Sequence, residues 1–158
     1  MTVVFAGAGI VLGLALAAVM VLVLTRSRMI DVFASPHDFE ETVTRLESAV
    51  ADAGWLMPDS KRLNDSLEKG NVRFPHRVHL IKLCEPRHPA EVPTDKRQVA
   101  CLMPCTFAVF QTDGGAVRVS RKNTALMGKV FGGSIRRVMG GGVADAERTM
   151  LRRALRPS

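Results

Sequence analysis

An uncharged apolar run at the start of the chain, residues 3–24, constrains the fold more than any other feature. A helix rises about 1.5 Å per residue, so this run would measure roughly 33 Å against a hydrocarbon core of about 30 Å. The length and the lack of charge predict one transmembrane helix over residues 3–24, within an N-terminal anchor at residues 1–28. The chain is therefore expected to be a single-pass protein of the cell membrane, with the lipid bilayer as a partner.

A cleaved signal peptide is the alternative interpretation of the same run. No Lys or Arg precedes it, and it exceeds the usual apolar length of about 7–15 residues in such peptides. The small residues Ala15, Ala17 and Ala18 are followed by more apolar residues, so no polar cleavage region is present. These three features favour a retained anchor.

Two arginines set the expected orientation. Arg26 and Arg28 follow the run directly, and no charge precedes it. Positive flanks remain on the cytoplasmic side, so the domain is expected to face the cytoplasm, with a periplasmic orientation as the alternative. Both side chains would then meet lipid headgroup phosphates.

The rest of the chain, residues 29–158, is long enough for one domain with its own core. The basic balance of the whole chain, 22 Lys and Arg against 15 Asp and Glu, suits anionic lipid, an acidic partner or nucleic acid, or only keeps the domain soluble. With an anchor present, lipid is the simplest explanation, and no nucleic acid is expected.

The order of predicted elements is α+β. Ser35-Pro36 opens a helix whose stripe of Phe39, Val43, Leu46 and Val50 ends at Gly54. Alternating apolar residues and a turn at Asp113-Gly114-Gly115 indicate strands. We expect one small antiparallel sheet packed by helices, with strands at 29–33, 55–57, 76–84, 99–111 and 116–120 and further helices at 60–69, 123–131 and 143–155.

Linked segments carry a resemblance to a known family. They are Phe39-Glu40-Glu41-Thr42-Val43 with Leu46, then Gly54-Trp55, Leu83-Cys84-Glu85-Pro86, Leu102-Met103-Pro104-Cys105 and a hairpin from Val109 to Val119. Over about residues 30–125 the chain resembles the bacterial and archaeal family called domain of unknown function 302. The resemblance implies a small α+β domain similar to the TATA-binding-protein-like fold, often a dimer, with no established enzymatic activity.

Two cysteines are the main candidate site. Cys84 and Cys105 fall where the family's motifs carry cysteine, and in an antiparallel sheet they could be neighbours. A close thiol pair could bind a soft metal such as Cu(I), form a reversible disulfide or attack a substrate; alternatively, both are small buried hydrophobes. A Cys/His metal site needs at least three converging ligands. His76 is the weaker candidate for the third ligand.

A glycine-rich segment suggests an anion site. Gly132-Gly133 and Gly140-Gly141-Gly142 lie close to Lys129, Arg136 and Arg137. Backbone amides and arginines together suit a phosphate or a lipid headgroup, whereas flexible helix junctions explain the glycines equally well. The spacing matches no nucleotide-binding fingerprint.

No catalytic constellation is recognisable, such as a G-x-S-x-G nucleophile elbow. The leading hypothesis is a membrane-anchored binding or assembly module, a homodimer without turnover of its own. The alternative is a thiol-based redox or copper-binding protein that uses Cys84 and Cys105. The sequence identifies no cofactor, ligand or substrate.

Overall fold

A single five-stranded sheet forms the centre of the computed structural model, which describes residues 13–17, 19, 20, 23, 28–86 and 103–157. Every neighbouring pair of strands is antiparallel, and the first two strands of the chain lie at opposite edges. In the order β1-β5-β4-β3-β2, the strands are β1 (Ile30–Ala34), β5 (Val117–Lys122), β4 (Cys105–Gln111), β3 (Val78–Cys84) and β2 (Leu56–Arg62).

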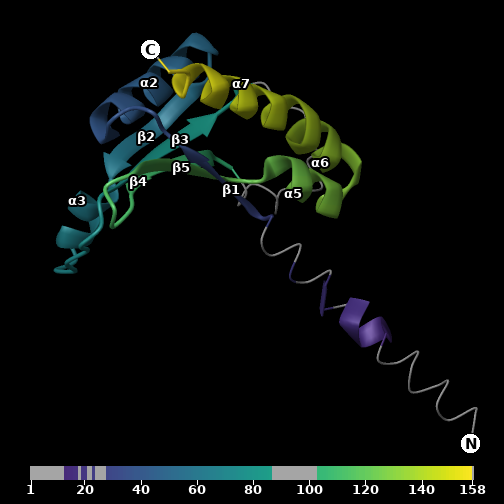
Figure 1. Ribbon diagram of the computed structural model, residues 1–158. Helices are drawn as coiled ribbons and strands as arrows, with labels where there is room; N and C mark the ends of the chain where they lie inside the picture. Colours follow the sequence, from purple (N-terminus) through teal and green to yellow (C-terminus); the bar gives the residue numbers. More distant parts are fainter. Residues whose placement is uncertain (1–12, 18, 21–22, 24–27, 87–102, 158) are drawn as a thin grey trace, which may run out of the picture.

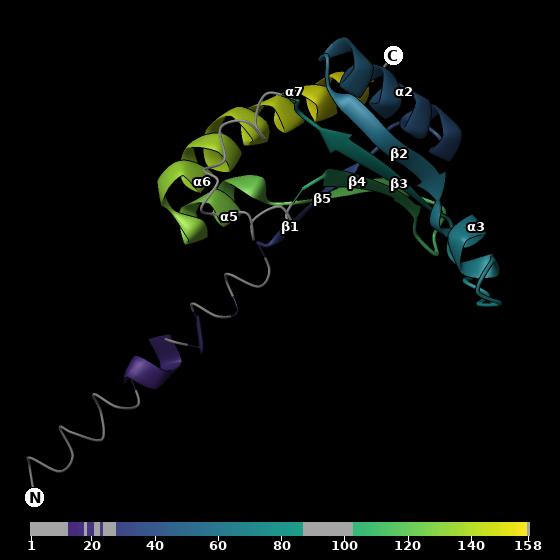
Figure 2. The same cartoon turned by 180° about the vertical axis from the view of Figure 1, so that it is seen from behind.

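The helices gather on one face of this sheet. Figures 1 and 2 show α2 and α7 side by side across that face, with α5 and α6 beyond one end and α3 at the opposite end. The helices are α2 (Phe39–Asp52), α3 (Leu63–Glu68), α5 (Thr124–Phe131), α6 (Gly133–Arg137), the π-helical turn η2 (Val138–Val143) and α7 (Ala144–Ala154). The sequence-based expectation of an α+β domain with an antiparallel sheet is confirmed.

The core lies between the helices and alternate residues of the three central strands. Ile81, Phe107 and Val119 are fully buried and point to the helical face, where Leu46 and Leu151 are buried as well. Each fully buried side chain of this kind contributes roughly 1.5–3 kcal/mol relative to exposure. The alternation therefore fixes which face of each strand meets α2 and α7.

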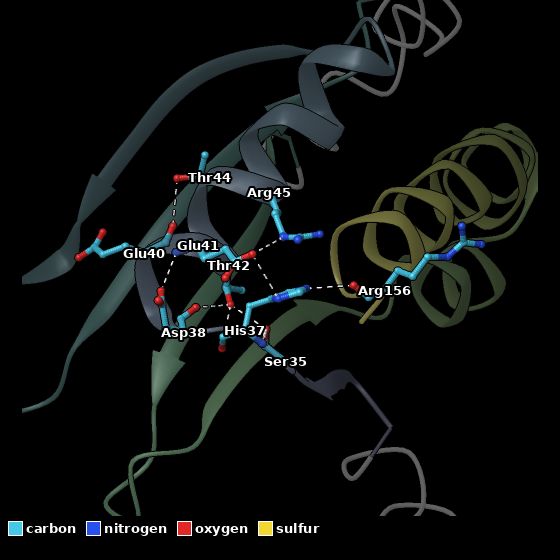
Figure 3. A network of polar contacts seen from close by, with 9 residues as sticks. All are labelled: Ser35, His37, Asp38, Glu40, Glu41, Thr42, Thr44, Arg45 and Arg156. Atoms are coloured by element: carbon cyan, nitrogen blue, oxygen red, sulfur yellow. Dashed lines mark hydrogen bonds and ion pairs between the residues drawn. The ribbon is translucent and has the colours of Figure 1, made fainter. Parts of the chain in front are cut away.

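A polar network joins the start of α2 to the end of α7 (Figure 3). The Asp38 carboxylate caps α2 by accepting a 2.8 Å hydrogen bond from the Glu41 amide. The His37 ring bridges the two helices, with Nδ1 3.4 Å from Glu41 Oε1 and Nε2 3.0 Å from the Arg156 carbonyl. The helix thus begins at Phe39, after Asp38, and not at the Ser35-Pro36 signal.

The predicted transmembrane helix is contradicted. Within the described residues, no helix has the length and apolar character needed to span a membrane. The prediction of a single-pass protein of the cell membrane relied on this helix and is corrected with it; residues 1–12, 18, 21, 22 and 24–27 lie outside the described residues.

The C-terminal glycines do not interrupt the last helix as expected. α6, η2 and α7 follow one another without a break, and Gly140 to Gly142 lie inside the π-helical turn. A close helix–helix approach explains one glycine nearby: a Cβ on Gly128 of α5 would lie 2.7 Å from the Gly140 backbone nitrogen. The backbones of α5 and η2 therefore meet where neither residue carries a side chain.

Candidate functional site

A small cavity opens where β3 ends and β4 begins. Its volume is about 40 Å³, and the π-helical turn η2 forms one side of it. π-helical turns occur often at functional sites, because the wider turn redirects side chains. The wall consists of Trp55, Leu83, Cys84, Glu85, Met103, Pro104, Cys105, Ile135, Val138, Met139 and Val143.

Both cysteines lie in the wall of this cavity. Strand register pairs Leu83 with Cys105, so Cys84 is one residue beyond the partner of Cys105. Cys105 is buried, with 8% of its surface exposed, whereas Cys84 is half-buried. Met103 and Met139 also line the cavity, so its wall includes four residues that contain sulfur.

The surroundings of Cys105 disfavour its thiolate. Burial raises the pKa of this thiol well above its usual range, and the nearby Glu147 carboxylate raises the pKa further by charge repulsion and by a hydrogen bond. Cys84 adds a smaller repulsion in the same direction. Cys105 is therefore a neutral thiol near pH 7, and it lacks the thiolate character that an attacking nucleophile needs.

A buried polar network lies on the other side of Cys105. Glu147 of α7 is 1% exposed and accepts hydrogen bonds from Arg121 Nη1 at 2.6 Å and from the Thr124 hydroxyl at 2.8 Å. Burial nevertheless raises the pKa of Glu147, because desolvation exceeds the effect of these partners and of Cys105. Arg121 also donates to Asp31 Oδ2 at 3.1 Å, so β1, β5 and α7 meet at one guanidinium.

The structure separates the other predicted site residues from the cysteines. His76 precedes β3, 3.7 Å from the Asp113 carboxylate, while Cys84 is at the other end of that strand, roughly 26 Å away for extended chain. Arg28 is exposed just before β1, and Arg26 lies outside the described residues. Arg136 and Arg137 border a separate depression of about 490 Å³ with Lys129, and its glycines belong to helical backbone instead of a free amide nest.

Metal ligands of the commonest kinds do not converge. Among residues 28–86 and 103–157, no group of three or more His, Cys, Asp or Glu side chains could hold a metal ion. The candidate donors in the wall of the cavity are two thiols and two thioethers, which form a soft and sulfur-rich set.

Sequence reasoning missed Glu147 and Arg121. Glu147 lies three and four residues before Met150 and Leu151, which both face the core. That spacing places Glu147 on the inner face of the helix and was the available signal. Arg121 continues the buried alternation of Val117 and Val119 on β5, which is the corresponding signal for a strand.

Comparison with known proteins adds the family. The sequence matches the family described as "Domain of unknown function DUF302" over residues 32–156. The chain belongs to the DUF302 family. The DUF302 match extends past residues 30–125 and includes the C-terminal helix, and no protein with a curated description matches the chain.

A solved DUF302 structure shares the fold. The crystal structure of an uncharacterized conserved DUF302 protein from Bacillus stearothermophilus has a TM-score of 0.68 and 16% sequence identity. The match covers 80% of this chain and 98% of that one. At this identity the likeness shows the fold and not the chemistry of the cavity.

Proposed function

We propose that this DUF302 domain is a binding module without turnover of its own, and that it holds a soft monovalent cation, Cu(I), between Cys84 and Cys105. The observation that carries the proposal is the single cavity whose wall contains both cysteines together with Met103 and Met139. Thiolates and thioethers are the ligands that favour Cu(I) over harder cations.

The size of the cavity limits the ligand. A water molecule needs about 10–15 Å³ of such space, and drug-sized ligands occupy about 300–1,000 Å³. The cavity of about 40 Å³ thus suits an ion better than an organic substrate. Its apolar side chains, such as Trp55 and Val138, would shield the bound ion from water.

The donor set also distinguishes among metals. Zinc sites take four ligands, or three and a water, and no such group of His, Cys, Asp and Glu exists among the described residues. Two cysteine sulfurs are enough for a two-coordinate soft cation, with a thioether available nearby. Burial and, after it, the nearby Glu147 raise the pKa of Cys105; a bound positive ion would counter both effects, and its binding would release the thiol proton.

The test is a titration with Cu(I) itself. The 158-residue chain would compete anaerobically with bicinchoninate for Cu(I), and loss of the coloured complex would measure binding. We expect one Cu(I) per chain, and at least about tenfold weaker binding in Cys84→Ser and in Cys105→Ser, because each removes one of two strong ligands. Cys101→Ser makes the same change at the third cysteine of the sequence, and a loss of affinity confined to this variant would contradict the assignment to Cys84 and Cys105.

Two results would contradict the proposal. One is binding of well below one equivalent of Cu(I) by a chain that circular dichroism shows to be folded. The other is unchanged affinity in both single variants. A thermal unfolding curve for each variant separates loss of the site from loss of the fold, and Met139→Leu tests the thioether without altering the apolar volume greatly.

A further inference from the structure

A second and larger hollow lies between the edge strand β1 and helix α7. Its volume is about 870 Å³, with apolar side chains of Phe33, Leu151 and Leu155 and three arginines, Arg148, Arg152 and Arg156. We propose that this groove binds an extended acidic segment of a partner protein, which adds to the sheet as a strand beside β1. The proposal is independent of the cavity at the cysteines.

The outer edge of β1 offers backbone groups for such a strand. The Ser35 amide donates to the Val117 carbonyl and the Asn123 amide donates to the Met29 carbonyl, so odd-numbered residues of β1 face β5. By the alternation of an antiparallel ladder, the N–H and C=O groups of Ile30, Val32 and Ala34 point away from the sheet. No proline interrupts β1, which leaves this edge open to strand addition.

α7 runs alongside β1 in the same direction. Near their starts, Arg121 contacts both Asp31 and Glu147. At their far ends, His37 beyond β1 bonds the carbonyl of Arg156 beyond α7 (Figure 3). A strand added at the outer edge of β1 would therefore lie along the helix and not across it.

The spacing of the arginines matches an extended chain. Arg148 and Arg152 are four residues apart on α7, a rise of about 6 Å, and Arg156 follows just beyond the end of the helix. Alternate side chains of a strand are about 6.6–6.8 Å apart. A partner with an acidic residue at every second position would present one carboxylate to each arginine.

The three arginines of the groove are not held in strong ion pairs with described carboxylates. Within the described part of the chain, Arg148 pairs only with the neighbouring Asp145, at 3.0 Å on the exposed helix surface, a contact of little strength. Among the described residues, Arg152 and Arg156 form no ion pair with a carboxylate, although Arg152 donates to the Thr149 hydroxyl at 3.4 Å. The intervening side chains of the partner would lie beside Ile30 and Val32, which are 60% and 49% exposed on the other face of the sheet.

The test uses labelled heptapeptides and the 158-residue chain, with binding followed by fluorescence anisotropy. The probe alternates valine with glutamate, and its control has the same composition with the glutamates consecutive. We expect the alternating peptide to bind at least about tenfold tighter, since only its carboxylates match the arginine spacing while its backbone pairs with β1.

Backbone pairing is tested by N-methylation of the peptide. One version carries methyl groups on every glutamate amide and the other on every valine amide. Only one set of amides can face β1, so one version should lose about tenfold in affinity and the other should bind like the parent. This test leaves the protein unaltered and does not depend on the folding of a variant.

Charge is tested by Arg152→Gln against Arg153→Gln. Arg153 is adjacent in sequence but pairs with Asp52 of α2 at 2.8 Å, outside the groove. We expect about three- to fivefold weaker binding for Arg152→Gln and no change for Arg153→Gln. Either of two results would overturn the proposal: equal binding of the alternating and consecutive peptides, or equal effects of the two variants. Tighter binding of a single-stranded oligonucleotide would also overturn it. So would sedimentation showing that a second copy of the chain occupies the groove and that the peptide cannot displace it.

Discussion

At the scale of single residues, a chain of hydrogen bonds determines the protonation of His79. Ser60 donates its one hydroxyl proton to Glu47 Oε1 at 2.5 Å, so His79 Nε2 donates to Ser60 Oγ at 2.9 Å. His79 Nδ1 is then unprotonated and buried, with no hydrogen-bond partner among the described residues. Because Nε2 carries a proton, the His79 ring cannot take the proton of the Ser60 hydroxyl. The three residues therefore do not form a nucleophile triad.

The pKa of His79 predicts a loss of stability in acid. Burial lowers this pKa, and the Arg62 charge lowers it further, against Glu47, Glu40 and Asp65, which raise it. Because the pKa of His79 is lower in the folded state, the unfolded chain binds the proton first as pH falls. The contribution of neutral His79 to stability is therefore present above the unfolded pKa of about 6.5. It is lost as pH falls through the folded pKa. Urea unfolding at pH 7 and pH 5 should show a smaller decrease for His79→Gln, which keeps a donor near Ser60, than for the parent chain; equal decreases would contradict the assignment.

The sequence predicted features of single residues correctly where they depend on neighbours in the chain. The helix predicted over residues 123–131 begins at Asn123, whose side chain caps α5 by accepting a 2.9 Å hydrogen bond from the Leu126 amide. The burial of Glu147 and Arg121 was missed, because a charged side chain reads as solvent-exposed until its partner from another element is known. Charge pairing across 26 residues of sequence, as in this ion pair, leaves no local pattern.

At the scale of elements, the meeting of α5 and η2 depends on glycine. A Cβ on Gly128 would lie 2.7 Å from the Gly140 nitrogen and 2.8 Å from its Cα, and both atoms belong to backbone that cannot rotate away. Ile135, Val138 and Met139 line the cavity from this same segment. The approach of the two helices therefore also positions one side of the candidate site.

Gly128→Ala should separate these helices. We expect a loss of about 1–3 kcal/mol in the free energy of unfolding, the usual cost of overpacking, measured by urea denaturation. Gly141→Ala is the matched control, because nothing lies within 4 Å of a Cβ at that position. The control should be neutral or slightly stabilising, since Ala exceeds Gly in helix propensity by about 0.8–1.0 kcal/mol; equal effects of the two changes would disprove the packing argument.

Elements with strong periodicity were predicted within a few residues, and the errors have physical causes. Ser60 to Arg62 was assigned to a helix but continues β2, because pairing with Ile81 to His79 outweighs the local pattern. The glycines near Gly140 suggested interruptions, whereas helix-to-helix contact lets them remain in a continuous helix. The apolar run at residues 3–24 predicted a membrane span, which the described residues contradict.

At the scale of the whole molecule, Arg121 links parts of the chain that are remote in sequence. It pairs with Asp31 of β1 and with Glu147 of α7, and Glu147 also binds Thr124 of α5. The sheet, its edge strand and two helices therefore share one buried charge cluster. Its burial makes every missing partner costly, because an unpaired charge has no access to water.

Arg121→Met should destabilise the fold by about 3–5 kcal/mol, because it leaves the Glu147 carboxylate buried without its ion pair. The double change Arg121→Met with Glu147→Leu should recover most of this loss, and chemical denaturation of both variants measures the coupling. Arg153→Gln, which breaks an exposed pair with Asp52, should cost less than about 1 kcal/mol. Additive losses from Arg121 and Glu147 would show that the two groups act separately.

The sheet order has a consequence for how the chain is made. Among the described strands β1 is synthesised first, yet its described neighbour in the sheet is β5, where Ile30 pairs with Lys122. Such distant pairing carries a large loop-closure cost and slows folding. Arg121, which pairs with Asp31 of β1, also pairs with Glu147 of α7, which is synthesised later still. The nascent chain therefore holds β1 without this sheet partner until β5 and α7 have been synthesised, and the described domain closes late in its folding.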